Sequence, residues 1–407
     1  MPGPLSHIRV LDLSRVLAGP WAGQTLADLG AEVIKVERPG LGDDTRGWGP
    51  PFLNDREGNP TSDAAYFLSA NRGKKSVTID FTLLEGQELV RRLAVDCDIV
   101  LENFKVGGLA KYGLDYDSLK AVNPGIIYCS ITGFGQTGPY RNRAGYDFLI
   151  QGMGGLMSVT GEPDCVPGGG PVKVGVAIVD IFTGMYAVTS VLAALANRER
   201  TGLGEYIDLA LLDVQVATLA NQATNYLVSG RSPERLGNAH PNIVPYQALA
   251  TSDGYIILAV GNDGQFAKFC AVAGSLEMAD DERFRTNSDR VCNRAELIPM
   301  IMTLLKKKTS AEWIAMLEQA GVPCGPINTI AEVFDNPQVQ SRGMRVDVPH
   351  AAAGHIPLVG SPMKFSRVPL NDRQPPPQLG EHNDDVLMGM LGLGAEDCER
   401  LKADAII

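Results

Sequence analysis

Asp180 is the residue in this chain whose type and surroundings point most directly to chemistry. It lies within residues 174–187, where almost every other side chain is apolar. A carboxylate placed there must leave water or receive hydrogen bonds, and either arrangement is costly unless it is compensated. Two interpretations follow. Asp180 could cap the helix expected at 183–195, because aspartate is a preferred N-cap residue, or it could be a nucleophile that attacks an activated acyl group.

The elements that must position such a residue alternate between strands and helices. Helical spacing of apolar side chains predicts helices at 22–30, 85–95 and 116–122. Short apolar runs predict strands at 8–13, 33–37, 77–81, 98–101 and 126–131. This alternation is typical of a parallel sheet covered by helices on both faces. Ligands of such sheets bind beyond the carboxyl ends of the strands, so residues that follow the strands are candidates for a binding site.

A second unit is predicted in the later part of the chain. Residues 206–228 carry a helical pattern and are expected to link the halves. Beyond them the pattern predicts one strand and three helices, at 255–260, 265–273, 294–307 and 311–320. We therefore predict an α/β fold with a Rossmann-like parallel sheet in a discontinuous large domain, residues 1–225 and 331–407. A smaller α/β domain is inserted at residues 226–330.

Composition narrows the classes of partner and compartment. The 407 residues carry a net charge of -11, which argues against nucleic acid and anionic membranes as partners. The seven cysteines are widely spread without a C-x-x-C pair, and the five histidines show no metal-ligand spacing. Residues 1–7 lack the features of a signal peptide, and no run of eighteen uninterrupted apolar residues occurs. We expect a soluble cytoplasmic protein that binds no metal.

The absence of two sequence motifs makes two common nucleotide-binding classes unlikely. The chain contains neither G-x-G-x-x-G nor G-x-x-x-x-G-K-[ST], which argues against a dehydrogenase or a P-loop NTPase. Basic residues nevertheless gather at expected strand ends and loops of the first third, where they could bind a phosphorylated ligand. Ordinary surface charge is the alternative. The basic residues are Arg38, Arg46, Arg72, Lys74, Lys75, Lys105, Lys111, Arg141 and Arg143.

Motifs spread over nearly the whole chain, in order, carry a family resemblance. They lie at residues 10–20, 26–40, 42–46, 71–76, 102–104, 131–139, 144–147, 200–202, 325–327 and 379–382. Together they resemble the class III CoA-transferases, the family that includes formyl-CoA transferase and carnitine CoA-transferase. The resemblance implies acyl-CoA and a small carboxylic acid as substrates, and an intertwined homodimer. No metal is implied.

The resemblance also assigns roles to individual residues. Asp180 falls on the nucleophilic aspartate of the family, which forms covalent aspartyl intermediates with the acyl group and with CoA. Asp147 falls where formyl-CoA transferase has an auxiliary glutamate. The positions that line the CoA site correspond to Val16, Ala18, Arg38, Arg72, Lys74, Asn103, Phe104, Lys111, Tyr146 and Asp147.

Three segments indicate the substrates within the family. Residues 15–20, 48–52 and 243–248 are similar to enzymes that use succinyl-CoA as donor and a dicarboxylate such as glutarate or hydroxymethylglutarate as acceptor. Leu17 replaces the glutamine of formyl-CoA transferase, and its run of four glycines is missing here, which argues against formyl or oxalate substrates. Residues that could bind the acceptor, or could equally be structural, are Arg15, Arg46, Trp48 and His240.

Two rival functions remain. Acyl-CoA racemases or isomerases share the family's fold and use a histidine and an aspartate as paired proton-transfer groups. Tyr146 occupies the place of that histidine, and a tyrosine is a poor base at neutral pH, which favours CoA transfer. A CoA-binding protein without catalysis is the third class, and the presence of Asp180 argues against it.

Overall fold

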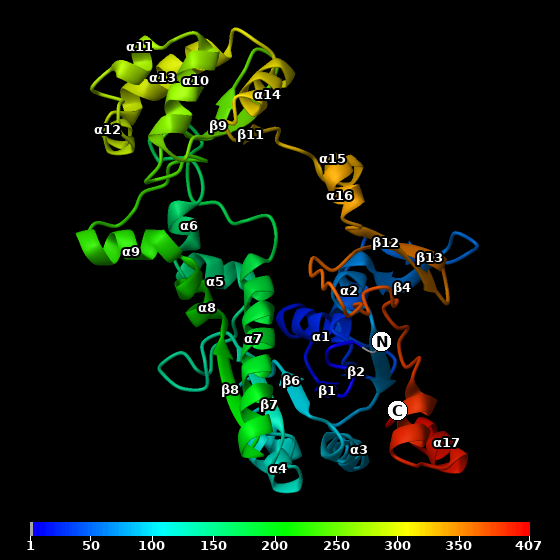
Figure 1. Ribbon diagram of the computed structural model, residues 1–407. Coiled ribbons are helices and arrows are strands. Elements are labelled where there is room, and N and C mark those ends of the chain that lie inside the picture. Colours follow the sequence, from blue (N-terminus) through cyan, green and yellow to red (C-terminus); the bar gives the residue numbers. More distant parts are fainter. Residues whose placement is uncertain (1–2) are drawn as a thin grey trace. The chain divides into compact units, whose positions relative to one another are not determined.

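The computed structural model describes residues 3–407, which form two compact units. Of these residues, the first unit comprises 3–154, Gly175–Ala220 and Pro337–Ile407, and the second comprises Gly155–Val174 and Asn221–Asn336. The second unit therefore includes residues 155–174, a segment that the sequence prediction assigns to the large domain. Its colours in Figure 1 run from green to orange.

The first unit is built on a six-stranded sheet in which every neighbouring pair is parallel. The strands occur in the spatial order β5-β2-β1-β6-β7-β8. Their bounds are β1 (Arg9–Asp12), β2 (Glu32–Glu37), β5 (Lys74–Thr78), β6 (Ile99–Glu102), β7 (Ile127–Thr132) and β8 (Glu205–Ala210). The predicted α/β fold with a parallel sheet is confirmed. The strand order reverses between β1 and β6, and this is the point where such sheets bind ligands.

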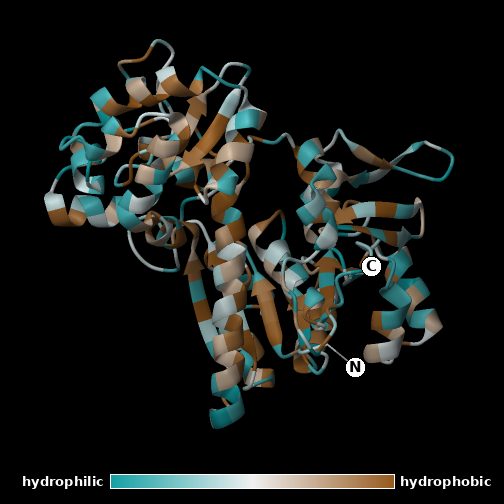
Figure 2. Ribbon diagram, turned by 45° about the horizontal axis from the view of Figure 1, so that its top comes forward, coloured by the Kyte–Doolittle hydropathy of each residue, from teal (hydrophilic) through white to brown (hydrophobic). Residues whose placement is uncertain are grey.

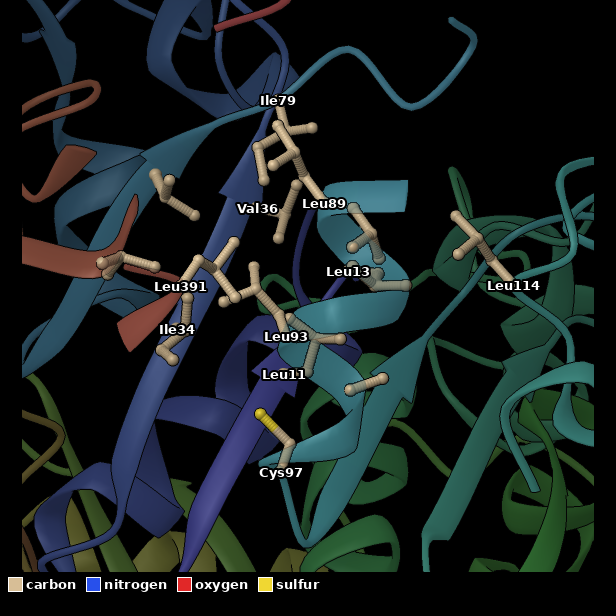
Figure 3. Packing of buried hydrophobic residues seen from close by; sticks show 14 of the residues in the cluster. Leu11, Leu13, Ile34, Val36, Ile79, Leu89, Leu93, Cys97, Leu114 and Leu391 are labelled. Atoms are coloured by element: carbon tan, nitrogen blue, oxygen red, sulfur yellow. The ribbon is translucent and has the colours of Figure 1, made fainter. Parts of the chain in front are cut away.

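Helices cover both faces of this sheet because its strands are apolar on both sides (Figure 2). On one face, α1 (Ala18–Asp28) and α7 (Ile178–Thr201) pack against Val10, Val33 and Leu101. On the other face lie α3 (Leu84–Val95) and α4 (Tyr116–Val122). Figure 3 shows that Leu89 and Leu93 of α3 meet β1 and β2 there. The helices packed on both faces thus hold the carboxyl ends of the strands in place.

Short elements complete the first unit. They are η1 (Asp44–Gly47), β3 (Phe52–Asn54), β4 (Pro60–Ala64), α2 (Ala65–Ala70), η2 (Ala110–Tyr112), α5 (Asp147–Met153), α8 (Leu211–Thr218), α16 (Pro337–Ser341), β12 (Arg345–His350), β13 (Gly354–Val359), the π-helix η3 (Asp385–Met390) and α17 (Ala395–Ala403).

The last segment of the chain docks on the edge strand β5. The Ser76 carbonyl accepts the N–H of His382, and the side chains of Asn383 and Thr78 bond to each other at 2.8 Å. The N–H of Asp80 donates to the Ile406 carbonyl. These contacts cover a strand edge that would otherwise expose unpaired backbone groups.

The second unit has its own core. Its sheet is antiparallel, in the order β11-β10-β9, with β9 (Tyr246–Ala250), β10 (Tyr255–Ala259) and β11 (Cys324–Gly325). Phe266, Phe269 and Trp313 are buried beside it. The helices are α6 (Leu156–Val159), α9 (Ala220–Ser229), α10 (Asp263–Ala273), α11 (Glu277–Asp280), α12 (Asn287–Cys292), α13 (Arg294–Leu305), α14 (Ser310–Gln319) and α15 (Ile330–Asp335).

Helix α7 departs from the expectation that no segment could span a membrane. Within residues 3–407 it is long and apolar enough to do so by length and composition alone. A core helix of a soluble protein has the same properties, and α7 buries Val188, Val191 and Leu195 against the sheet and α1. Packing against the sheet and α1 accounts for the apolar residues on that face of α7.

Candidate active site

A cavity of about 700 Å³ opens beyond the carboxyl ends of β1, β2, β6 and β7, at the strand-order reversal. The turn after β1, the loop after β2 and the turn after β6 form much of its wall. The structure brings ten of the predicted site residues together there. They are Arg15, Val16, Ala18, Arg38, Trp48, Asn103, Phe104, Lys111, Tyr146 and Asp180.

Asp180 lies in the first turn of α7, not at its N-cap. The helix begins at Ile178, and the N-cap residue is Ala177, which has no capping side chain. The capping interpretation of Asp180 is therefore wrong. The carboxylate of Asp147 caps the helix instead, because it accepts the N–H groups of Val179 at 2.8 Å and of Asp180 at 3.4 Å. Asp147 thus fixes the turn that carries Asp180.

The surroundings of Asp180 favour its protonated form. Burial, together with the smaller effect of the nearby negative charge of Asp147, raises the pKa of its carboxyl to about 7. A carboxylate that is poorly solvated but still ionised in part at neutral pH is a more reactive nucleophile than one in water.

Of the five carboxylates that line the cavity, four have partners in the described structure. Glu37 pairs with Arg46, and Asp43 pairs with Lys35 at 2.9 Å. Asp44 pairs with Arg15, and Asp80 accepts the N–H and hydroxyl of Thr82. Asp180 is the fifth, and no ion pair or hydrogen bond to its side chain occurs among residues 3–407 in this structure. Its carboxylate is the one left available for a ligand in the cavity.

Three predicted ligand-binding cations do not line the cavity. Arg46 is buried between Glu37 at 2.7 Å and Asp63 at 2.6 Å, with its guanidinium over the Phe67 ring. Arg72 forms a buried ion pair with Asp28. Buried charges need such partners, so these two side chains hold the fold together at the edge of the sheet.

Lys74 is the third of these cations. Its ammonium group is fully buried and donates to Asp12 at 2.9 Å, Asn71 at 2.8 Å and the Pro20 carbonyl at 2.9 Å. All three donor positions of the ammonium are thereby used. Lys74 ties β5 to β1 and α1 beneath the cavity.

Comparisons with known proteins identify the family. The model of CoA-transferase family III matches residues 5–383. The chain belongs to CoA-transferase family III. It is 56% identical to the succinate–glutarate CoA-transferase of Agrobacterium fabrum, over 94% of this chain and 95% of the relative. It is 44% identical to the succinyl-CoA:glutarate CoA-transferase of Mus musculus, over 99% of this chain and 90% of the relative.

A solved structure agrees in fold as well. The crystal structure of a CaiB/BaiF family protein from Brucella suis is 55% identical, with a TM-score of 0.84, over 96% of this chain and all of that one. The resemblance read from the sequence motifs is confirmed. This chain is a CoA-transferase, and its family acts on CoA thioesters.

Two further cations of the CoA-transferase cavity are among the basic residues that the sequence offered for a phosphorylated ligand, although the family resemblance assigned them no role. Arg141 and Arg143 line the cavity, from the loop that follows β7. The guanidinium of Arg143 lies 4.7 Å from the Tyr140 ring centroid and 5.4 Å from that of Phe134. The rule that ligands lie beyond strand ends pointed to this loop, since β7 ends at Thr132.

His240, a predicted acceptor contact, belongs to the second unit. Its ring packs against Tyr246, and its Nδ1 accepts the N–H of Asn242. Burial and the charge of Arg294 lower its pKa, so the imidazole is neutral at pH 7. A neutral histidine offers a hydrogen bond rather than a charge to a carboxylate. In residues 3–407 no cluster of three metal-ligating side chains is present.

Proposed function

We propose that this CoA-transferase moves CoA from succinyl-CoA to a free dicarboxylate such as glutarate or hydroxymethylglutarate, through covalent intermediates on Asp180. The observation that carries the proposal is the unpaired, desolvated carboxylate of Asp180 in the cavity. The names of the relatives from Agrobacterium fabrum and Mus musculus, both glutarate CoA-transferases, support the choice of substrates.

The proposed reaction has four steps. Asp180 attacks the thioester carbonyl of succinyl-CoA, which forms a mixed anhydride and releases CoA thiolate. The thiolate attacks the aspartyl carbonyl, which gives an aspartyl-CoA thioester and free succinate. The acceptor carboxylate attacks this thioester, which forms a second anhydride and releases the thiolate again. The thiolate then attacks the acceptor acyl carbonyl and regenerates Asp180. Each step exchanges one activated carbonyl for another, so no ATP is consumed.

The walls of the cavity suit an acyl-CoA. Arg38, Lys111 and Arg143 supply cations for its phosphates, and Phe104 supplies an apolar face. Leu17, Ile131 and Leu211 bring apolar side chains to the same cavity as Asp180. An apolar lining excludes water, which would hydrolyse the anhydride. Arg15 is a candidate for the second carboxylate of the acceptor, and Trp48 for the wall against which its carbon chain lies.

We also propose a cytoplasmic homodimer. The seven cysteines are all free thiols, which fits a reducing compartment. Helix α7 exposes Phe182, Met185 and Tyr186, each about two-fifths accessible, on one stretch beyond Asp180. Contiguous exposed apolar side chains of this size are typical of a protein interface. A second copy of the chain fits the intertwined dimer that the family resemblance implies.

Incubation of the purified protein with succinyl-CoA and a panel of acids headed by glutarate, without ATP or metal, tests the proposal. Chromatography should show a new acyl-CoA that matches the succinyl-CoA lost. Asp180→Ala should abolish transfer and leave CoA binding measurable by calorimetry. Asp213→Ala, which removes an exposed aspartate from the first turn of α8, should leave the rate unchanged.

Turnover by Asp180→Ala would contradict the proposed nucleophile. If no acid accepts CoA, the proposed substrates are wrong. Uptake of deuterium at the α-carbon of a 2-methylacyl-CoA would then support the racemase instead.

A further inference from the structure

Among the described residues that line the cavity, Val16, at the end of the turn Ser14–Val16, is the one non-glycine residue with a positive φ. Val16 has φ of 71°, in the left-handed region. L-residues avoid this region, and a β-branched side chain makes it still less favourable. Val16 lines the cavity and leads directly into Leu17 and Ala18, where α1 begins. Something outside the turn must hold it in this conformation.

Side chains from several elements hold five consecutive backbone groups of the turn. The Ser14 N–H donates to Asp12, and the Ser14 carbonyl accepts from Lys35 at 2.8 Å. The Val16 N–H donates to Asp43 at 3.3 Å. Asp12, Lys35 and Asp43 are themselves buried in ion pairs, so these contacts belong to the rigid core of the unit.

Asn103 makes the remaining two contacts from the opposite side of the strand-order reversal. Its Oδ1 accepts the Arg15 N–H at 2.9 Å, and its Nδ2 donates to the Arg15 carbonyl at 2.6 Å. Asn103 follows β6, whereas Arg15 follows β1, so one carboxamide bridges the two strands between which the sheet order reverses. Both ends of the carboxamide are thereby occupied by backbone.

We propose that Asn103 is a positioning residue that locks Val16 in its left-handed conformation and so fixes the part of the cavity wall that leads into α1. The inference rests on the proposed function for its kinetic consequence. The two hydrogen bonds from Asn103 hold the backbone of Arg15, the residue immediately before Val16. If Val16 relaxed to a negative φ, the chain would enter Leu17 and Ala18 in a different direction.

The wall and the nucleophile are coupled by direct contact between helices. A Cβ placed on Gly184 would lie 2.7 Å from the Ala18 carbonyl oxygen, so α7 touches the start of α1 one turn beyond Asp180. A change of direction at Val16 moves Ala18 relative to this contact. The acyl group would then meet Asp180 in a less favourable geometry, and such errors reduce kcat more than they raise KM.

A double-mutant cycle tests the clamp. Asn103→Ala is made in the wild type and in a Val16→Gly background, and kcat and KM for succinyl-CoA are measured for all four proteins. Glycine adopts positive φ without strain, so the loss of the clamp should matter less there. Asn103→Ala should lower kcat roughly tenfold in the wild type and at most about threefold in the Val16→Gly background.

Asn123→Ala is the matched control. The Asn123 carboxamide also bonds to backbone in both directions, to the Cys97 carbonyl at 2.8 Å and from the Gly125 N–H at 3.2 Å. It lies near the amino end of β7, away from the cavity. Its effect should be the same factor in both backgrounds, because distant sites are additive.

The outcomes separate the inference from the proposed function. An equal loss of kcat in both backgrounds, or a loss confined to KM, would overturn the clamp and indicate direct contact of Asn103 with CoA. If the wild type transfers no CoA, the proposed function fails, and the same cycle read by thermal unfolding still tests the clamp. The fall in Tm caused by Asn103→Ala should then be smaller in the Val16→Gly background. If Asn103→Ala does not fold, Asn103→Asp, which keeps the acceptor and loses the donor, takes its place.

Discussion

At the scale of a single residue, the ionisation of Asp180, the proposed nucleophile, should set the pH dependence of the reaction. Only the carboxylate can attack a thioester, and the pKa of Asp180 is raised to about 7. Activity should therefore rise with pH through neutrality and level off above about pH 8, and it should fall about tenfold per pH unit below pH 6. The pH profile of kcat/KM for succinyl-CoA measures this directly. An acidic limb near pH 4 would show that the free enzyme does not desolvate the carboxylate.

Replacement of Asp147 should shift the acidic limb of the pH profile. The negative charge of Asp147 contributes to the raised pKa of Asp180, so Asp147→Asn should shift the acidic limb of kcat/KM to lower pH. The asparagine oxygen can still accept the N–H groups of Val179 and Asp180, so the helix start should survive. Asp213→Asn, made on the exposed surface of α8, should leave the limb in place. A limb that does not move in Asp147→Asn would leave burial as the sole cause.

Adjacent lysines on β5 should differ widely in their effect on stability. Lys74→Ala leaves Asp12 buried without its partner and should lower the free energy of unfolding by about 3–5 kcal/mol. Lys75 is partly exposed and pairs with Glu32 and Asp385 near the surface, so Lys75→Ala should cost about 1 kcal/mol or less. Denaturant unfolding of both variants measures this difference in the free energy of unfolding. A raised KM for succinyl-CoA in Lys74→Ala at unchanged stability would instead support the CoA contact predicted from the family resemblance.

At the scale of elements, the contact between α1 and α7 should tolerate no side chain at Gly184. The backbone there is ordinary helix, so space alone excludes larger residues. Gly184→Ala should push α7 away from the Ala18 carbonyl, lower stability by about 1–3 kcal/mol and reduce kcat. Gly175→Ala is the control, because a Cβ there meets nothing within 4 Å. Equal stability and equal kcat of the two variants would show that α1 and α7 can move apart without loss of stability.

The elements could be predicted where the local pattern and the fold agree. The strands β1, β2, β6 and β7 and the helices α3 and α4 lie within one or two residues of their predicted bounds, because apolar periodicity specifies buried elements well. The strand β8 was missed: residues 206–210 were assigned to a helix, yet they pair with β7 along its whole length. Pairing with a neighbour is a tertiary property that local propensity does not contain.

The residues of the candidate site likewise divide into those that could be predicted from the sequence and those that could not. Positions after strand ends, such as Arg15, Arg38 and Asn103, were found because the fold class dictates where ligands bind. The role of Arg46 as a buried ion pair could not be seen, because Asp63 is seventeen residues away in the chain. Asp180 was identified correctly as unusual, but the capping alternative could be rejected only once Asp147 was placed beside it.

At the scale of the whole molecule, the protein should sediment as a dimer of two 43.5 kDa chains. Tyr186→Glu places a charge in the exposed apolar stretch of α7 and should shift the mass toward the monomer at micromolar concentration. Leu84→Glu changes a side chain that is 81% exposed on the other face of the sheet, and it should leave the mass unchanged. A monomeric wild type would refute the proposed assembly.

The docking of the last segment on β5 has a consequence for the order in which the protein is made. The strands β1 to β8 leave the ribosome long before residues 382–406, which cover the β5 edge and bond to Asp80 at the rim of the cavity. Domains fold as units during synthesis, so the second unit can complete its core while the first still waits for its final segment. A nascent chain that stalls before residue 380 would therefore expose the unpaired backbone groups of the β5 edge, and we expect chaperones to bind it.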